Sequence, residues 1–358
     1  NVDDNLRLKY RYLDLRKQKM QNNLTFRHRV TKVARDYYDE MGFTEVETPM
    51  LIKSTPEGAR DYIVPSRVHP GSFYALPQSP QMFKQLLMVG GTDRYMQITK
   101  CFRDEDLRAD RQPEFTQIDL EMSFVDVDEV ISIQEGFLQR LFREVMHEEI
   151  TLPLPRIPYD EAMERYGSDK PDTRFGFELV KLNDAVKGCA FGVFTDALAA
   201  GGDVRGICID GGSAHFSRKD IDKMQESLKA YGAKGLVWIR HNGDEVTSSV
   251  NKFFDQEQLK TILSVMGAKE GDLCLIVCGK PKVVFDSLGF LRRDIARKLG
   301  LLSDNVHNLL WVVDFPLYEY DDETNTYSAM HHPFTSPRPE DVDKLESDPG
   351  SVKAQAYD

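Results

Sequence analysis

Two runs of alternating apolar and polar residues, separated by a charged loop, form the clearest pattern in this chain. The first run spans residues 95–103 and the second spans residues 115–124. Alternation with a period of two is typical of β-strands, because successive side chains of a strand point to opposite faces. The pattern therefore predicts an antiparallel hairpin with one apolar face and one polar face.

The polar face of this hairpin carries an arginine, carboxylates and amides at regular spacing. Its members are Gln97, Thr99, Cys101, Arg103, Gln117, Asp119, Glu121 and Ser123. Pairing the two runs about the loop predicts that Arg103 lies opposite Phe115 and that Thr99 lies opposite Asp119. The pattern alone leaves two interpretations open, a solvated face of a half-exposed hairpin or a binding site.

Helical periodicity precedes the hairpin twice. The first segment, residues 16–41, has apolar residues at spacings of three and four, which predicts an amphipathic helix capped at Gly42. These apolar positions are Phe26, Val30, Val33, Tyr37 and Met41. Residues 43–47 then alternate as a strand that Pro49 ends or places at an edge. A long helix followed by an edge strand is plain scaffold or, alternatively, a dimer face.

The second helix is predicted to begin at Ser79-Pro80 and to stop at Gly90-Gly91. Serine is a good N-cap and proline a good first helical residue. Gln81 and Lys84 share one face near the helix start, where free N–H groups favour a carboxylate. Because a lysine there is unfavourable for helix stability, we expect Lys84 to have a ligand rather than solvent alone.

Two loops carry further candidate residues. Pro56 and Gly58 predict a turn around Glu57, whose carboxylate could hold an ammonium group or could simply be solvated. His331 and His332 are adjacent, so they point to opposite sides of an extended chain and make a poor metal pair. They are either a mobile cover over a substrate or ordinary loop residues.

A composition change separates the hairpin region from a second region rich in apolar runs. A helix predicted over residues 128–147 is followed by the proline-rich segment TLPLPRIP, which indicates a boundary, and by a short helix over residues 159–166. From there the chain alternates strands and helices as a separate α/β unit. We predict strands at 206–209, 236–239, 273–277 and 309–318, and helices at 219–231, 256–266 and 286–299.

Composition narrows the functional classes. The chain has 358 residues, 41% of them hydrophobic, and a net charge of −12, which repels nucleic acid on average but leaves room for a local basic patch. Five cysteines without a CxxC spacing favour reduced thiols in a cytosol and argue against a zinc site. The sequence contains no apolar run of membrane-spanning length, so we predict no membrane partner. The first residue is not methionine, so we expect the sequence to begin inside a longer protein.

Several strings of residues resemble one enzyme family. Phe102-Arg103-Asp104-Glu105, a variable loop and Arg111-x-x-x-Phe115 are similar to motif 2 of class II aminoacyl-tRNA synthetases, and residues 42–49 resemble their motif 1. The strings TPEGARDY, QSPQMFKQLL, CFRDEDLRADRQPEFTQID, YGSDKPDTRFG and AMHHPFTSP resemble bacterial aspartyl-tRNA synthetases. The resemblance covers nearly the whole chain.

This resemblance implies an α+β fold, with a class II antiparallel sheet flanked by helices and an inserted α/β domain. It predicts a hinge over residues 1–15, a first catalytic part with motifs 1 and 2 over 16–173, a GAD-like insertion over 174–302 and a further catalytic part over 303–358. The family's anticodon-binding barrel and its motif 3 have no counterpart in the sequence. We therefore expect the chain to be a fragment of a longer enzyme.

The resemblance also implies ATP-dependent ligation of L-aspartate to tRNA through an aspartyl-adenylate. ATP with Mg²⁺, tRNA(Asp) and a second subunit bound through the motif 1 region are the implied partners, in the cytoplasm. Charging of tRNA(Asn) as well is left open. The alternatives are an asparaginyl-tRNA synthetase and a non-catalytic synthetase-like binding module.

By the same resemblance, Arg103 is the catalytic residue, and it bridges the aspartate carboxylate and the α-phosphate. The residues implied for aspartate binding are Glu57, Gln81, Lys84, Arg103, Asp119, His331 and His332; those implied for ATP are Arg103, Asp104, Glu105, Gln112 and Phe115. Lys84 would select aspartate over asparagine, and no residue of the chain is assigned as a metal ligand. Arg108 and Arg111 either contact the acceptor end of tRNA or pair with Asp104, Asp106 and Asp110.

Overall fold

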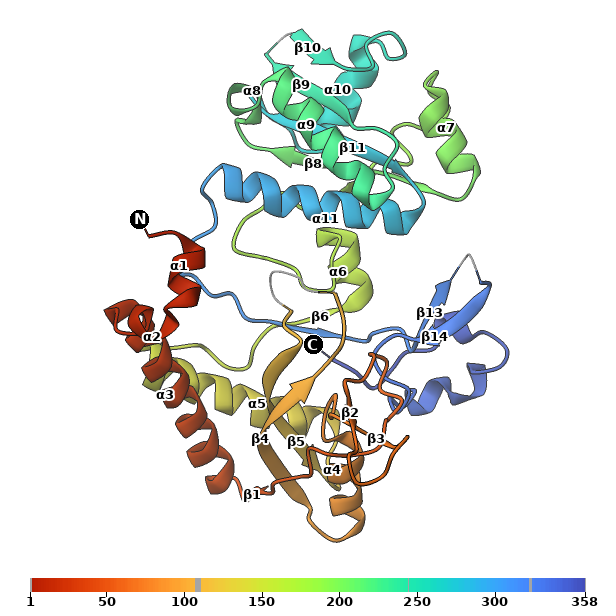
Figure 1. Ribbon diagram of the computed structural model, residues 1–358. Helices are drawn as coiled ribbons and strands as arrows, with labels where there is room; N and C mark the ends of the chain where they lie inside the picture. Colours follow the sequence, from red (N-terminus) through yellow and green to blue (C-terminus); the bar gives the residue numbers. More distant parts are fainter. Residues whose placement is uncertain (1, 107–110, 244, 322–323, 358) are drawn as a thin grey trace. The chain divides into compact units, whose positions relative to one another are not determined.

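Strands β4 (Arg94–Phe102) and β5 (Glu114–Met122) form the predicted antiparallel hairpin (Figure 1). The structure, a computed structural model, describes residues 2–106, 111–243, 245–321 and 324–357. These residues form two compact units, one comprising Asn1–Leu154 with His332–Phe334 and the other Pro155–His331 with Thr335–Asp358. The first boundary falls within the proline-rich segment that the composition singled out. The predicted limits of the hinge, the insertion and the remaining catalytic part stay predictions.

The predicted register of the hairpin is wrong by two residues. Phe102 lies opposite Glu114, Cys101 opposite Phe115, and Gln97 opposite Asp119. The ladder ends earlier than expected, because β4 stops at Phe102 and the N–H of the next residue, Arg103, donates to the carbonyl of Pro113 at 2.9 Å. A displacement of two residues leaves every side chain on its predicted face.

The first unit surrounds this hairpin with helices and short strands. Its remaining elements are α1 (Asp4–Lys9), α2 (Arg11–Asp14), α3 (Gln18–Glu40), β1 (Thr44–Glu45), β2 (Ile63–Pro65), β3 (Phe73–Ala75), α4 (Gln81–Val89), α5 (Val127–Leu141) and the π-helix η1 (Phe142–Met146). Strand β1 is the predicted edge strand and runs parallel to β4, so the sheet order is β1-β4-β5. The segment expected as a hinge contains two short helices.

The apolar face of the hairpin packs against α3 and α5, the helices that accompany β4 and β5 in Figure 1. Met96, Ile98, Ile118 and Leu120 contribute to this core from the strands. Helix α3 ends close to the prediction, and Gly42 follows it with a φ of +80° that glycine adopts without strain. Phe26 does not join the core as expected: it is 48% exposed, because the core contacts come from the C-terminal half of α3.

The second unit is built around a five-stranded sheet with strand order β10-β9-β11-β8-β7, and all of its pairings are antiparallel. The strands are β7 (Val180–Lys181), β8 (Asp203–Ile209), β9 (Val237–Asn242), β10 (Glu245–Ser248) and β11 (Leu273–Gly279). The helices are α7 (Gly192–Ala199), α8 (Gly212–His215), α9 (Arg218–Leu228), α10 (Gln256–Val265), α11 (Pro281–Lys298) and the 3₁₀ turn η2 (Lys229–Tyr231). One apolar cluster joins the sheet to α9 and α11, and another joins it to α7 and α10. The predicted alternation of strands and helices is confirmed.

The rest of the second unit consists of short elements. They are β6 (Arg156–Pro158), α6 (Tyr159–Tyr166), β12 (Trp311–Val313), β13 (Tyr318–Asp321), β14 (Thr326–Ala329), and the 3₁₀ turns η3 (Pro339–Lys344) and η4 (Pro349–Ser351). Helix α6 has the predicted bounds. The strand predicted over residues 309–318 is interrupted, because Asp314 has a φ of +63° and Pro316 cannot donate a ladder hydrogen bond. Within the described residues, no helix combines the length and the apolar character that a membrane crossing needs.

Candidate functional site

Lys84 is the buried cation of the hairpin's polar face. It lies on α4, which crosses this face, and only 8% of the residue is exposed. Its ammonium group donates to Asp119 Oδ1 at 2.8 Å and to the Leu120 carbonyl at 3.3 Å, and Glu121 Oε2 lies 3.3 Å away. Lys84 is therefore not solvated but paired with two carboxylates of β5, and its binding of a ligand stays a prediction.

Asp119 keeps one carboxylate oxygen open. Its Oδ1 binds Lys84, whereas its Oδ2 is buried and has no hydrogen-bond partner among the described residues. A buried, unpaired carboxylate oxygen is costly, so such an atom is a strong candidate to receive a donor from a ligand. Cys101 is also buried on this face, and burial together with the charge of Asp119 raises the pKa of its thiol to about 12. The polar face is thus buried around Asp119, whereas Gln117, Glu121 and Ser123 are only partly buried.

Glu57 lies on a loop that is held in place by Gln78. The Glu57 carboxylate accepts hydrogen bonds from Thr55 Oγ1 at 3.0 Å and from Ser79 Oγ at 2.5 Å. The amide of Gln78, a residue that is 1% exposed, accepts from the Ala59 N–H at 3.0 Å and donates to the Ala59 carbonyl at 2.9 Å. Glu57 therefore has a defined position beside the start of α4.

Helix α4 begins at Gln81, one residue later than predicted, with Pro80 in the cap position. The Ser79 hydroxyl donates to Glu57 and accepts only a weak bond of 3.3 Å from the Gln81 N–H. Ser79 therefore connects the Glu57 loop to the helix instead of acting as a simple N-cap. Gln81 is partly buried at this helix start.

Arg103 follows the last pair of the hairpin, and its guanidinium carbon lies 5.1 Å from the centre of the Phe115 ring. This distance is typical of a cation–π contact. Among the residues that the structure describes, no carboxylate lies within ion-pair distance of this guanidinium. The Asp104 N–H donates to the Arg60 carbonyl at 2.9 Å and Arg60 Nε donates to the Asp104 carbonyl at 3.1 Å, which ties the Glu57 loop to the segment after Arg103. Arg103 is thus a charged fork held on an aromatic ring with its donors open.

The remaining residues expected to contact ATP lie on the exposed loop of the hairpin. Asp104, Glu105 and Gln112 are exposed, and Glu105 forms a weak ion pair of 3.6 Å with Arg111. The interpretation of Arg111 as a residue that pairs with a neighbouring acid is thereby supported, although its partner is not one of the aspartates that were expected. Arg108 lies outside the described residues.

The comparisons with known proteins agree with this geometry. A family model described as tRNA synthetases class II (D, K and N) matches residues 3–358. The chain belongs to this family. Aspartate–tRNA ligase of Ruminiclostridium cellulolyticum is 59% identical over 359 residues, which cover all of this chain and 60% of that protein. A Clostridium perfringens aspartate–tRNA ligase is 57% identical over 356 residues, which cover 99% of this chain and 60% of that protein.

A further relative, from Natranaerobius thermophilus, is named aspartate–tRNA(Asp/Asn) ligase. It is 56% identical over 358 residues, which cover all of this chain and 61% of that protein. The chain thus spans about three fifths of the length of these curated relatives. The resemblance to class II synthetases that the motifs indicated is confirmed.

The two histidines of this synthetase chain fall in different units. His331 belongs to the second unit and His332 to the first. The centre of the His331 ring lies 4.6 Å from the centre of the Phe315 ring. His332 Nδ1 accepts from the Phe334 N–H at 3.1 Å, while its Nε2 is buried without a hydrogen-bond partner in the described chain. A role of either histidine as a substrate cover stays a prediction.

Two residues beside the candidate site were not predicted from the sequence. Gln78 shapes the Glu57 loop, and Tyr95 is buried on β4 beside Asp119. Neither residue stands out in the sequence, because a glutamine before a helix and a tyrosine in a strand are common. Their polarity at positions that prove fully buried is the only signal, and burial of this kind depends on the tertiary fold.

In the described chain, one group of side chains has the spacing of metal ligands. It consists of Cys208, Asp210 and Asp272 in the second unit. Both Asp272 oxygens already accept backbone N–H groups, from Gly211 and from Lys269, each at 2.8 Å. A thiol in the set does not suit Mg²⁺, which prefers oxygen ligands. The described residues therefore do not fit a protein-held magnesium site, and we derive no step through one.

Proposed function

We propose that the protein to which this chain belongs ligates L-aspartate to tRNA through an aspartyl-adenylate. The observation that carries this proposal is the buried Lys84–Asp119 pair with the open Asp119 Oδ2, on the same sheet face as the Arg103 guanidinium, which has no ion-pair partner among the described residues. Such a face offers a cation for one carboxylate, an anion for an ammonium group and a planar fork for a second carboxylate or a phosphate. Those are the charged groups of aspartate and ATP.

In the proposed first step, the α-carboxylate of aspartate attacks the α-phosphorus of ATP and pyrophosphate leaves. Arg103 would hold the attacking carboxylate and a phosphate oxygen together, since its guanidinium can bind two oxygens in one plane. Phe115 already supports that guanidinium and would also offer its ring to adenine. Positioning and neutralisation of phosphate charge account for catalysis of this type, so no protein nucleophile is needed.

Recognition of aspartate would use the Lys84–Asp119 pair. The substrate ammonium would donate to Asp119 Oδ2 and to the Glu57 carboxylate, with Gln81 beside them. The side-chain carboxylate of aspartate would take a share of Lys84, which now binds Asp119 and Glu121. An asparagine amide would leave that buried cation less well paired, which should cost roughly 1–3 kcal/mol.

The exposed loop residues Asp104, Glu105 and Gln112 complete the proposed ATP site. Magnesium is proposed to enter with the ATP phosphates, since its usual role there is to bridge phosphate oxygens. His331 and His332 are proposed to cover bound aspartate. These assignments rest on motif 2 and on the family to which the chain belongs.

A homodimer through the motif 1 region is the proposed assembly. Support comes from α3, whose Leu24 and Phe26 are 51% and 48% exposed, and from the short edge strand β1 that follows it. A cytoplasmic location is proposed because all five cysteines are free thiols. Relatives named aspartate–tRNA ligase and aspartate–tRNA(Asp/Asn) ligase are similarly close, so tRNA(Asn) is proposed only as a second substrate to be tested.

Amino-acid-dependent exchange of pyrophosphate into ATP tests the proposal on the full-length protein. We expect exchange with aspartate and none with asparagine. Exchange with asparagine alone would identify the related asparagine enzyme, and no exchange with either amino acid would favour a non-catalytic module. Charging of unfractionated tRNA, followed by sequencing of the acylated species, would then separate the two tRNA substrates.

A further inference from the structure

Gln97 lies on the polar face of β4 and connects two segments that are distant in sequence. It is 4% exposed. Its Oε1 accepts from the backbone N–H of Thr48 at 3.4 Å, and its Nε2 donates to the Thr48 hydroxyl at 2.9 Å and to the Tyr95 hydroxyl at 3.0 Å. The amide therefore bridges the segment after β1 and a buried tyrosine.

The Thr48 N–H determines the direction of this bridge. A backbone N–H can only donate, so the atom of Gln97 that faces it must be the amide oxygen. The amide nitrogen must then face Tyr95, whose hydroxyl oxygen becomes the acceptor. A hydroxyl that accepts from one neighbour still has its own proton to donate to another, so the Tyr95 proton is left for a different group.

Asp119 is the carboxylate beside Tyr95 that can accept this hydroxyl proton. It lies opposite Gln97 in the hairpin register, and its buried Oδ2 has no hydrogen-bond partner in the described chain. Burial and the charge of Asp119 together raise the pKa of Tyr95 above its usual value, which keeps the phenol protonated and able to donate. Among the described residues, the ionisable groups around Asp119 include Lys84 from α4, Glu121 from β5 and Cys101 from β4. The charges of Glu57 and Arg103 act on the same Cys101 thiol as Asp119 does.

We infer that Gln97 is a positioning residue of the aspartate site, which turns the Tyr95 hydroxyl proton toward Asp119. This inference rests on the proposed function and adds to it the residues that orient the ammonium-binding carboxylate. Asp119 would then be held by Lys84 on one oxygen and steadied by Tyr95 near the other. Because Thr48 is an anchor of the bridge, the segment after β1 acts on the aspartate site through Gln97.

The isosteric substitution Gln97→Glu tests the inference, because it keeps the shape and reverses the hydrogen-bond direction. The new carboxylate can only accept, so it would draw the Tyr95 proton away from Asp119 and add a second negative charge nearby. In the full-length protein we expect the KM for aspartate in pyrophosphate exchange to rise about tenfold, the usual worth of one charge-assisted hydrogen bond. The KM for ATP should stay within about twofold of wild type, as should kcat, because Gln97 faces neither phosphate nor adenine.

The pH dependence of kcat/KM for aspartate is a second measurement. A purely structural role of Gln97 would leave the shape of this profile unchanged. Gln97→Glu places a second carboxylate beside Asp119 and removes the proton that Tyr95 would direct to it. The acidic limb of kcat/KM for aspartate should therefore lie at higher pH in Gln97→Glu than in wild type, whereas a purely structural loss would lower kcat/KM equally at every pH. A profile and an aspartate KM equal to wild type would overturn the inference.

Tyr95→Phe tests whether Gln97 acts through the tyrosine, and it remains informative if Gln97→Glu does not fold. We expect Tyr95→Phe alone to raise the KM for aspartate. Gln97→Leu should have little further effect in that background, because substitutions within one hydrogen-bonded network do not have additive effects. Fully additive losses would show that Gln97 acts independently of Tyr95 and would also overturn the inference.

The first unit offers a matched control. Tyr38, another fully buried tyrosine, donates to Gln134 Oε1 at 2.9 Å on the helical side of the same unit. Gln134→Leu removes an equivalent bond, so it should leave the aspartate KM within about twofold of wild type. Absence of aspartate-dependent exchange in the wild-type protein would refute the proposed function, whereas normal exchange with an unaffected Gln97→Glu would refute this inference alone.

Discussion

At the scale of single residues, burial gives meaning to polar side chains that look ordinary in the sequence. Lys84 and Asp119 are both less than 10% exposed, and neither could be tolerated there without the other. The position of Lys84 near a helix start predicted that it would have a ligand. It could not predict which one, because the two carboxylates belong to Asp119 and Glu121 of β5, which lie 35 and 37 residues after Lys84 in the sequence.

Arg103→Ala tests the residue on which the proposed chemistry depends. The side chain contacts Phe115 and no carboxylate of the described chain, so its loss should lower stability by only about 0.5–1 kcal/mol. Aspartate-dependent pyrophosphate exchange by the full-length variant should fall at least about 10²–10³-fold, as expected for a group that binds developing charge. Near-ultraviolet circular dichroism should remain unchanged.

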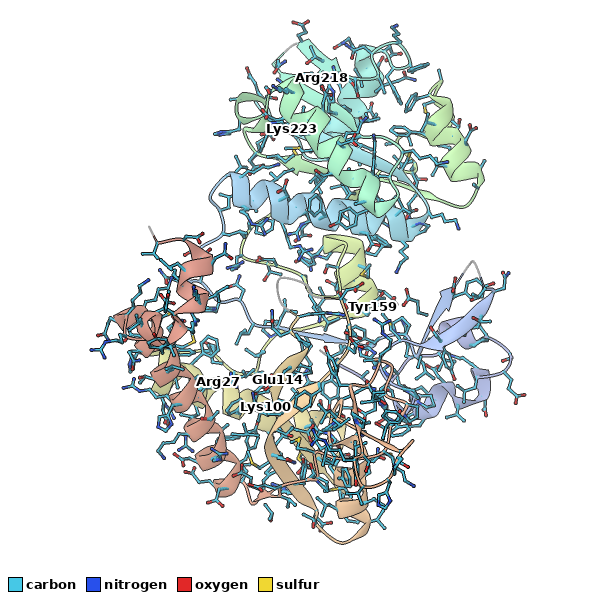
Figure 2. The ribbon with its side chains drawn as sticks, in the orientation of Figure 1. Arg27, Lys100, Glu114, Tyr159, Arg218 and Lys223 are labelled. Atoms are coloured by element: carbon cyan, nitrogen blue, oxygen red, sulfur yellow. The ribbon has the colours of Figure 1, made fainter. Side chains whose placement is uncertain are left out.

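Lys100→Ala is the control for this prediction. Lys100 lies on β4, the strand that ends just before Arg103, but on the opposite face. There it pairs with exposed Glu114 at 2.6 Å, and Figure 2 labels both side chains. Exposed pairs of this kind contribute little to stability, so exchange and stability should match wild type. Exchange by Arg103→Ala at the level of Lys100→Ala would show that the site has been assigned wrongly.

Asp172 provides a test of pH dependence in the second unit. Hydrogen bonds from the Arg174 guanidinium hold the pKa of the Asp172 carboxyl below its usual value. A lowered folded pKa contributes stability that is present above the unfolded pKa of about 4 and is lost as the pH falls through the folded pKa. Asp172→Asn should therefore be less stable than wild type at pH 7, and the two should converge toward pH 3. Urea titrations between pH 7 and pH 3 measure the two free energies of unfolding. A difference between the variants that does not change with pH would contradict the lowered pKa of Asp172.

At the scale of elements, periodicity predicted which segments pair but not how their ends meet. The faces of β4 and β5 follow from alternation alone, whereas the register depends on where the ladder closes at Arg103 and Pro113. Helix α6 has its predicted bounds, and Gly167 ends it with a φ of +64°. The contact that this glycine makes with α11 depends on tertiary packing and has no signature in the local sequence.

Gly289→Ala tests that contact. A Cβ at Gly289 of α11 would lie 2.4 Å from the Gly167 carbonyl oxygen, too close without a shift of backbone. We expect a loss of about 2 kcal/mol or more in the free energy of unfolding, as for an overpacked core. Both tryptophans, Trp238 and Trp311, belong to the second unit, so their fluorescence during urea unfolding reports this loss.

Gly192→Ala on α7 is the matched control, since the nearest atom to its added Cβ is 4.0 Å away. Alanine favours helix over glycine, so this variant should be as stable as wild type or slightly more stable. Equal losses in the two variants would mean that helix α11 does not approach Gly167 as closely as described.

At the scale of the whole molecule, the described chain comprises two units with separate cores. The apolar clusters of the second unit are made only by its own residues, among them the sheet residues Ile207, Ile239 and Leu275. We therefore expect residues 155–358, expressed alone, to fold cooperatively with the tryptophan emission maximum of the longer chain. Urea unfolding followed by fluorescence and far-ultraviolet circular dichroism would test this. A red-shifted emission without a cooperative transition would contradict it.

The sequence alone was sufficient for most of the longer helices and strands, for the polar and apolar faces of the hairpin and for the family. Each of these depends on local periodicity or on contiguous motifs, which are properties of neighbouring residues. Only the tertiary structure decided the hairpin register, the burial of the polar face, the Lys84–Asp119 pair and the bridge from Thr48 through Gln97 to Tyr95. These features join residues that are distant in sequence, and their free energies depend on exclusion of water, which no local pattern reports.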